Sequence, residues 1–170
     1  MVDWCIGTIN SSWYTTGKDD WATPRWLFAQ LDREFHFTLD PCATSANAVC
    51  SAYFTAAADG RLQPWPGRVF CNPPYGRGTE EWFAHAESEI ASGRCELAVF
   101  LTPARTDTVW FHRYVLRAHE LRFIRGRLSY GLTPLPSPAP FPSIVSIFRP
   151  GPHTTPILTS IPNRPPTPQL

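Results

Sequence analysis

The residues with the clearest chemical potential lie in the segment Asn72-Pro73-Pro74-Tyr75, which follows a short apolar run over residues 69–71. The apolar run is typical of a buried strand. Proline has no N–H and a fixed φ, so two successive prolines end strand pairing and hold the backbone stiff and extended. An amide side chain, two backbone carbonyls and an aromatic ring therefore follow the carboxyl end of a strand. In open α/β sheets, ligands bind at that end.

These groups could activate a weak amine nucleophile. The amine of a purine ring is unreactive because its lone pair is delocalised. Two acceptors, the Asn72 side-chain oxygen and the Pro73 carbonyl, would draw the nitrogen toward tetrahedral geometry and free that lone pair for attack on a methyl donor. Tyr75 would stack on the ring and fix its plane. No general base is required, since the alkylated nitrogen becomes acidic. The structural alternative is a Pro-Pro turn that closes a strand, with Tyr75 in the core.

The length of 170 residues predicts a single domain, small for a complete doubly wound enzyme. Seven tryptophans and eleven phenylalanines in a composition that is 43% apolar predict an aromatic-rich core. Nineteen prolines gather late in the sequence. We expect a loose lead-in over residues 1–18, a globular domain over 19–150, and a disordered or extended Pro-rich tail over 151–170.

The net charge is only +1, but the charges are unevenly distributed. Residues 1–60 carry three basic and seven acidic side chains, a net charge of −4, whereas residues 105–127 carry six arginines against two acidic residues, a net charge of +4. A polyanion should therefore bind the second half of the chain. For Arg113 and Arg117, the simpler explanation is that they solvate the face of a helix.

Five cysteines occur without a C-x-x-C pair, and no secretory segment is recognisable. This pattern indicates reduced thiols in a cytoplasmic protein rather than a disulfide framework. No histidine stands at ligand spacing from a cysteine, so we expect no metal site. No apolar run has membrane-spanning length, so we expect no membrane contact. The oligomeric state does not follow from the sequence; a monomer is assumed.

The elements before the Asn72 segment can be predicted from pattern and capping. Thr23 is expected to cap a helix that begins at Pro24 and ends near Glu34. Residues 35–40 alternate and predict a first central strand, whose carboxyl end carries Asp40. Only about thirty residues separate Asp40 from Asn72, too few for two complete βα units, so the sheet must be abbreviated here. A short strand is expected over residues 52–55.

The elements after the segment alternate more regularly. We expect a helix capped by Thr79 and ended by Gly93, a buried strand over residues 96–101, and a helix over 108–119 capped by Asp107. Strands over residues 121–125 and 143–148 have no helix between them, which predicts a hairpin. Arg105 follows a strand end and therefore points to the same rim as Asn72, where it could contact a phosphate or a base.

In this order the motifs resemble the small phage-type DNA N6-adenine methyltransferases, the Dam family. The resemblance spans about residues 19–150. The segments that carry it are residues 21–24, 37–44, 47–48, 53–55, 59–60, 70–76, 103–108, 110–112, 122–128 and 139–143. A run of motifs in order is far more specific than any one of them.

The resemblance implies an α/β fold: an abbreviated Rossmann-like methyltransferase sheet, mostly parallel, with a C-terminal antiparallel hairpin. It implies S-adenosylmethionine as donor and a flipped adenine of double-stranded DNA as acceptor. The Gly-rich donor loop of methyltransferases is missing. The implied catalytic residues are Asn72, Pro73, Pro74 and Tyr75; the donor-binding residues are Trp21, Thr23, Pro24, Asp40, Cys42 and Asp59; the DNA-binding residues are Arg105, Arg125 and Arg127.

Three alternatives remain open. Asn-Pro-Pro-Tyr also serves methylation of protein glutamine, and related enzymes methylate cytosine N4. A catalytically silent nucleic-acid-binding module of the same fold would explain the abbreviated region and the absent glycines. For Asp59 in particular, an Asp-Gly turn is the structural alternative to a contact with the adenosyl group.

Overall fold

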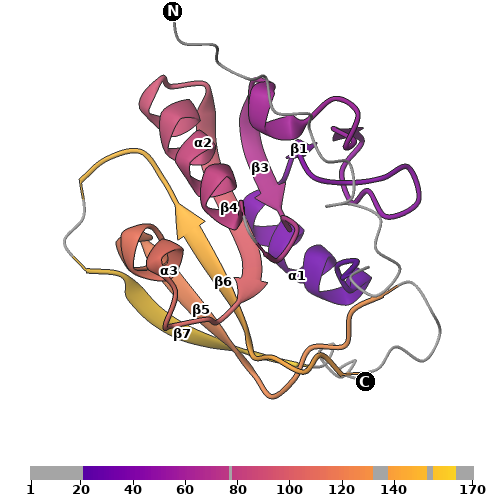
Figure 1. Ribbon diagram of the computed structural model, residues 1–170, viewed down its shortest axis with the longest axis vertical. Coiled ribbons are helices and arrows are strands. Elements are labelled where there is room, and N and C mark those ends of the chain that lie inside the picture. The colour runs from indigo at the N-terminus through magenta and orange to yellow at the C-terminus, as the bar shows by residue number, and fades with distance from the viewer. Residues whose placement is uncertain (1–20, 77, 132–137, 153–154, 164–170) are drawn as a thin grey trace, which may run out of the picture.

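The computed structural model describes residues 21–76, 78–131, 138–152 and 155–163 (Figure 1). The predicted lead-in over residues 1–18 lies outside them. The described chain forms one seven-stranded sheet in the order β2-β1-β3-β4-β6-β5-β7. The strands are β1 (Leu39–Asp40), β2 (Ala52–Tyr53), β3 (Gly67–Cys71), β4 (Cys95–Pro103), β5 (Glu120–Arg125), β6 (Ser143–Phe148) and β7 (Ile157–Pro162).

The sheet topology confirms the predicted fold class. Strands β2, β1, β3 and β4 are parallel neighbours, and β6 runs antiparallel to both β4 and β5. The expected β5–β6 hairpin is therefore present, with β6 inserted between β4 and β5. The abbreviation is also confirmed, because β1 and β2 have two residues each.

Helices cover both faces of the sheet. Helix α2 (Thr79–Ala91), helix α3 (Val109–Arg113) and the 3₁₀ turn η3 (Val115–Arg117) pack with Ala98 and Phe100 of β4 on one face. Helix α1 (Arg25–Phe35) packs with Val99 and Leu101 of β4 on the other face. The alternation along β4 explains the continuous apolar run in the sequence, since both sets of side chains are buried.

The predicted caps of α1 and α2 are wrong. Pro24 is the residue that caps α1, and no side chain accepts a hydrogen bond there, because Thr23 contacts Asn72 instead. Gly78 caps α2 in a left-handed conformation, with φ of 93°, while the buried Thr79 is the first helical residue. The predicted start and end of both helices are nevertheless within about two residues of the observed bounds.

The predicted strand over residues 35–40 is much shorter. Phe35 remains in α1, and His36 ends that helix in the left-handed region with φ of 53°. The predicted helix over residues 108–119 divides into α3 and η3, and its cap is Thr108 rather than Asp107, since Thr108 accepts from the Phe111 N–H.

The expected tail over residues 151–170 contains a strand, so disorder is wrong for residues 157–162. Strand β7 pairs in parallel with β5 over six residues and buries Ile161 against the α1 face. As an edge strand it tolerates Pro162 at its end. The Asn163 side chain then donates to the Arg127 carbonyl, at 3.4 Å. Among the described residues, no helix combines the length and hydrophobicity required to cross a membrane.

Candidate active site

In the described sheet, every strand except β6 has its carboxyl end at the same edge. Strands β1, β3 and β4 are mutually parallel, and β5 has the same direction because both β4 and β5 are antiparallel to β6. The residues at or just beyond these ends include Asp40, Asn72, Arg105 and Arg125. The convergence expected from the sequence is therefore present.

The Asn72 carboxamide has all of its groups hydrogen-bonded. Its Nδ2 donates to the Trp21 carbonyl oxygen at 2.7 Å and to Thr23 Oγ1 at 3.0 Å. Its Oδ1 accepts from the Tyr75 hydroxyl at 2.6 Å. Because a backbone carbonyl can only accept, the Trp21 contact determines which end of the amide is nitrogen. Oδ1 therefore lies on the side of Tyr75.

A chain of hydroxyl groups extends from Tyr75 into the protein. Its oxygen lies 3.2 Å from the Tyr130 hydroxyl, which lies 2.9 Å from Ser143 Oγ. If Ser143 donates to Tyr130 and Tyr130 to Tyr75, each hydroxyl donates one hydrogen bond and the last is accepted by Asn72. Burial raises the pKa of Tyr130 to about 12, and burial together with Tyr130 raises the pKa of Tyr75 well above its usual range. Both phenols therefore keep their protons at neutral pH.

Four aromatic rings surround this hydroxyl chain. The rings of Trp21 and Tyr75 are stacked with centroids 6.5 Å apart. The Phe141 ring is edge-on to both, with its centroid 4.9 Å from that of Trp21 and 5.5 Å from that of Tyr75. Tyr130 is edge-on to Trp21 at 5.5 Å. Tyr130, Phe141 and Ser143 were not predicted as site residues, although the segment 139–143 belongs to the run of family motifs. Their proximity depends on how the β5–β6 connection folds back, which no local pattern predicts.

The loop that contains the two prolines is anchored at the start of α2. Pro73 is buried, and no described residue donates to its carbonyl. The Pro74 carbonyl is 3.1 Å from Thr79 Oγ1, which also accepts from the Gly76 N–H at 3.1 Å. Thr79 thus holds the loop against α2 instead of capping that helix.

The loop after β1 is shaped by Asp40. Its buried carboxylate accepts from the Cys42 N–H at 3.3 Å and from the Val49 N–H at 3.2 Å. Burial raises its pKa to about 6, against the effect of these hydrogen bonds and of Arg25. Arg25 in turn donates to the Ala48 carbonyl at 2.9 Å. The start of α1, with the buried Pro24, and the loop carrying the half-buried Cys42 are therefore fixed to each other.

A glycine from another segment approaches this loop closely. A Cβ on Gly60 would stand 2.0 Å from the Pro41 carbonyl oxygen, so no other residue fits there. Asp59 caps the turn of residues 60–62 (η2) and binds Arg61, whose hydrogen bond is the main reason why its pKa is lowered. The structure thus has the Asp-Gly turn that was the structural alternative for Asp59, and a donor contact there remains a prediction.

The arginines fall into two groups. Arg113 pairs with Glu80 at 2.8 Å and Arg117 with Glu87 at 3.1 Å, both on α2. Arg105, Arg125 and Arg127 are exposed, and their side chains form no ion pair with any described residue. The three arginines predicted to bind DNA are therefore available, and the two interpreted as solvating a helix face do pair there.

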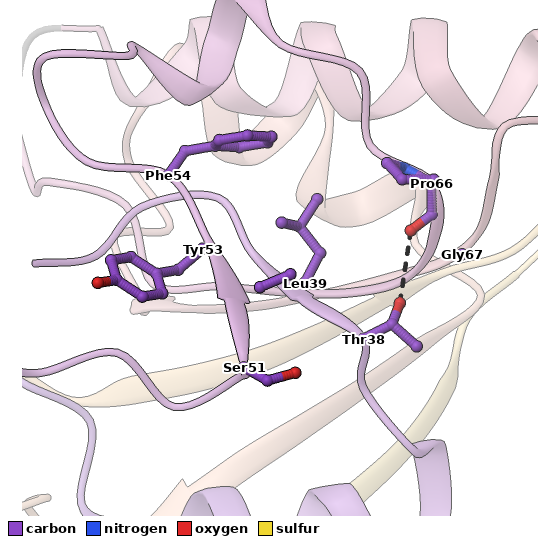
Figure 2. A pocket seen from close by; sticks show the side chains of 8 residues that line it. Thr38, Leu39, Ser51, Tyr53, Phe54, Pro66 and Gly67 are labelled. Atoms are coloured by element: carbon purple, nitrogen blue, oxygen red, sulfur yellow. Dashed lines mark hydrogen bonds between the residues drawn. The ribbon is translucent and has the colours of Figure 1, made fainter. Parts of the chain in front are cut away.

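A pocket of about 550 Å³ lies elsewhere on the sheet (Figure 2). Its walls include Thr38, Ser51 and Pro66, which precede β1, β2 and β3, so it lies toward the amino ends of these strands. No predicted site residue lines it. Within the described part of the chain, no cluster of three or more histidine, cysteine or acidic side chains could hold a metal ion.

Comparison with known proteins bears on this arrangement. A family model described as DNA N-6-adenine-methyltransferase (Dam) matches residues 10–157. A protein of Haemophilus phage HP1 named DNA N-6-adenine-methyltransferase is 30% identical over 110 residues, which are 63% of this chain and 62% of the phage protein. The match thus spans less than two thirds of that relative.

Proposed function

The chain belongs to the DNA N-6-adenine-methyltransferase (Dam) family, and from this membership we propose that it methylates N6 of adenine in double-stranded DNA, with S-adenosylmethionine as donor. The observation that carries the proposal is the Asn72 amide. Its oxygen is fixed at the carboxyl end of β3, and no described residue donates to the carbonyl of the next residue, Pro73.

In the proposed mechanism, the target amine takes the place that the Tyr75 hydroxyl has in this structure. Asn72 Oδ1 and the Pro73 carbonyl accept its two hydrogens and localise its lone pair for attack. Tyr75, released from Asn72, stacks on the flipped base. The proton is lost to water after alkylation, because the nitrogen is then acidic. No side chain needs to act as a general base.

S-adenosylmethionine, when bound, supplies an electrophilic methyl group on a sulfonium sulfur. We propose that it is held by Trp21, Thr23 and Pro24 and by the loop after β1, with Cys42 and the Asp59 turn nearby. The fit rests on the Arg25–Ala48 hydrogen bond, which joins the start of α1 to the loop after β1, and on Gly60, which allows close backbone packing without a Gly-rich loop. Both Asp40 oxygens already accept backbone N–H groups, so its proposed role is to shape this loop.

DNA would approach the same edge of the sheet. Arg105 follows β4, and Arg125 and Arg127 lie at and beyond the end of β5. Exposed and without ion pairs among the described residues, they are suited to phosphates on either side of a flipped base.

The test is direct. The purified chain is incubated with S-adenosylmethionine and unmodified DNA made by amplification, the DNA is digested, and the nucleosides are measured by mass spectrometry. We expect N6-methyladenine, with Asn72→Ala reducing the rate by at least about 100-fold while donor binding persists. N4-methylcytosine would keep the mechanism and change the base. No product from a protein that still binds DNA would overturn the proposal in favour of a silent module.

A further inference from the structure

The Asn72 amide is held by a segment that is distant in sequence. Thr23 and the Trp21 carbonyl precede α1, whereas Asn72 follows β3, and the two hydrogen bonds at 3.0 and 2.7 Å join these segments across the edge of the sheet. Thr23 is only 5% exposed, so its hydrogen bond to Asn72 is shielded from water. The resemblance to methyltransferases assigned Thr23 to the donor only.

We propose that Thr23 is a positioning residue for Asn72, and that together with the Trp21 carbonyl it sets the direction of Oδ1 and requires an amide rather than a carboxylate at position 72. The inference rests on the proposed function for its catalytic consequence. Its structural part, the direction of the amide, can be tested without activity.

The reason lies in the two different ends of a carboxamide. A rotated amide would place Oδ1 2.7 Å from the Trp21 carbonyl oxygen, two acceptors without a proton between them. The same rotation would place Nδ2 on the side of Tyr75, where it could not accept from a substrate amine. The Thr23 hydroxyl can donate as well as accept, so the Trp21 carbonyl alone excludes the reverse direction. Thr23 then accepts from Nδ2 and holds the amide in the productive direction.

The same geometry excludes an ionised carboxylate. Aspartate at this position would direct one oxygen at the Trp21 carbonyl and at Thr23, and only the protonated acid could donate to that carbonyl. We therefore expect Asn72→Asp to transfer methyl groups measurably only at low pH, with a rate that falls as pH rises. A role of Asn72 in folding alone would give no such pH profile.

Thr23→Val removes the acceptor and preserves the shape of the side chain, and Thr23→Ser is the matched control that preserves the hydroxyl. We expect Thr23→Val to lower kcat about tenfold at saturating S-adenosylmethionine, as for one lost hydrogen bond to a group in the reaction, with little change in KM for DNA. Thr23→Ser should retain kcat. An unchanged kcat in Thr23→Val, or a loss confined to donor affinity, would overturn the positioning role.

A second measurement separates this failure from failure of the proposed function. In ¹⁵N NMR spectra, the Asn72 side-chain amide is identified by its absence in Asn72→Asp. We expect one of its two proton signals to move upfield in Thr23→Val and to remain in place in Thr23→Ser. Unmoved signals would overturn the inference even in an active enzyme. A wild-type chain without transfer activity, but with these shifts, would overturn the proposed function and keep the amide geometry.

Discussion

At the scale of single residues, Tyr75 has two groups that interact with different partners: its hydroxyl binds Asn72, and its ring is proposed to stack on the target base. Stacking on a base requires the ring, whereas the hydrogen bond at 2.6 Å to Oδ1 requires the hydroxyl and competes with the substrate amine. In the proposed mechanism, the hydroxyl therefore stabilises the enzyme without substrate, and the ring stabilises the complex with a flipped base.

We accordingly expect Tyr75→Phe to keep kcat within about threefold, because it retains the ring and frees Oδ1. Tyr75→Ala should lower kcat/KM by about 10- to 100-fold, the effect of a lost base–aromatic stack. Steady-state kinetics with an oligonucleotide substrate measures both. Equal losses in the two variants would show that the hydroxyl, and not the ring, is needed for transfer.

Asp40 gives a prediction about stability and pH. Its pKa rises from 3.8 to about 6 on folding, chiefly through burial. Between these values the folded protein retains a proton that the unfolded chain has lost, so this contribution is complete below about pH 4 and disappears above about pH 6.

The contribution is isolated by comparison with Asp40→Asn, which cannot titrate. The free energy of unfolding of the wild type, minus that of Asp40→Asn, should fall by up to about 3 kcal/mol between pH 4 and pH 6. Urea unfolding across this range measures the difference. A difference that is flat or rises with pH would show that the folded state does not raise the pKa of Asp40.

The position of some site residues could be predicted from the sequence, and the contacts of others could not. Asn72 could be predicted to follow the end of a strand, because the two prolines after it leave few alternatives to a strand end at this point. Thr23 was expected to cap a helix, since capping is local, but its hydroxyl serves Asn72, 49 positions away. Tyr130 and Ser143 were missed for the same reason: their contacts depend on a long connection, which no periodicity describes.

At the scale of elements, the longest periodic segments were predicted well and the shortest were not. Helix α2 and strands β4 and β6 each bury several residues, so their patterns are clear. Strands β1 and β2 have two residues each and are held by their neighbours rather than by propensity. Strand β7 was obscured by the prolines around it, and it forms because β5 offers an unpaired edge.

The contribution of β7 to the free energy of unfolding can be measured with one pair of substitutions. Ile161 is 3% exposed and lies opposite Ile124, whereas Leu158 of the same strand is 63% exposed. Ile161→Ala should lower the free energy of unfolding by about 2–4 kcal/mol through the lost core contact. Leu158→Ala should change it by less than about 0.5 kcal/mol. Similar values for both, measured by urea unfolding, would show that β7 is not docked on the domain.

At the scale of the whole molecule, the net charge of +1 conceals a separation of charge. Arg113 and Arg117 are neutralised by glutamates of α2, which lies on one face of the sheet. Arg105, Arg125 and Arg127, which form no ion pair with a described residue, lie instead at or just beyond strand ends on the edge that holds Asn72. The sequence predicted this excess of charge, but only the fold separates the paired arginines from the available ones.

We expect Arg125→Ala and Arg127→Ala each to weaken DNA binding and to reduce the slope of log K against log salt by about one unit, the value for one lost phosphate contact on duplex DNA. Arg113→Ala and Arg117→Ala change the net charge by the same amount and should leave the slope nearly unchanged, because their charges are already paired. The slopes are measured by fluorescence anisotropy with a labelled duplex, between about 50 and 200 mM salt. If all four variants reduce the slope equally, net charge alone determines binding; if only the α2-facing pair does, the DNA lies across that face and not at the edge where Asn72 is held.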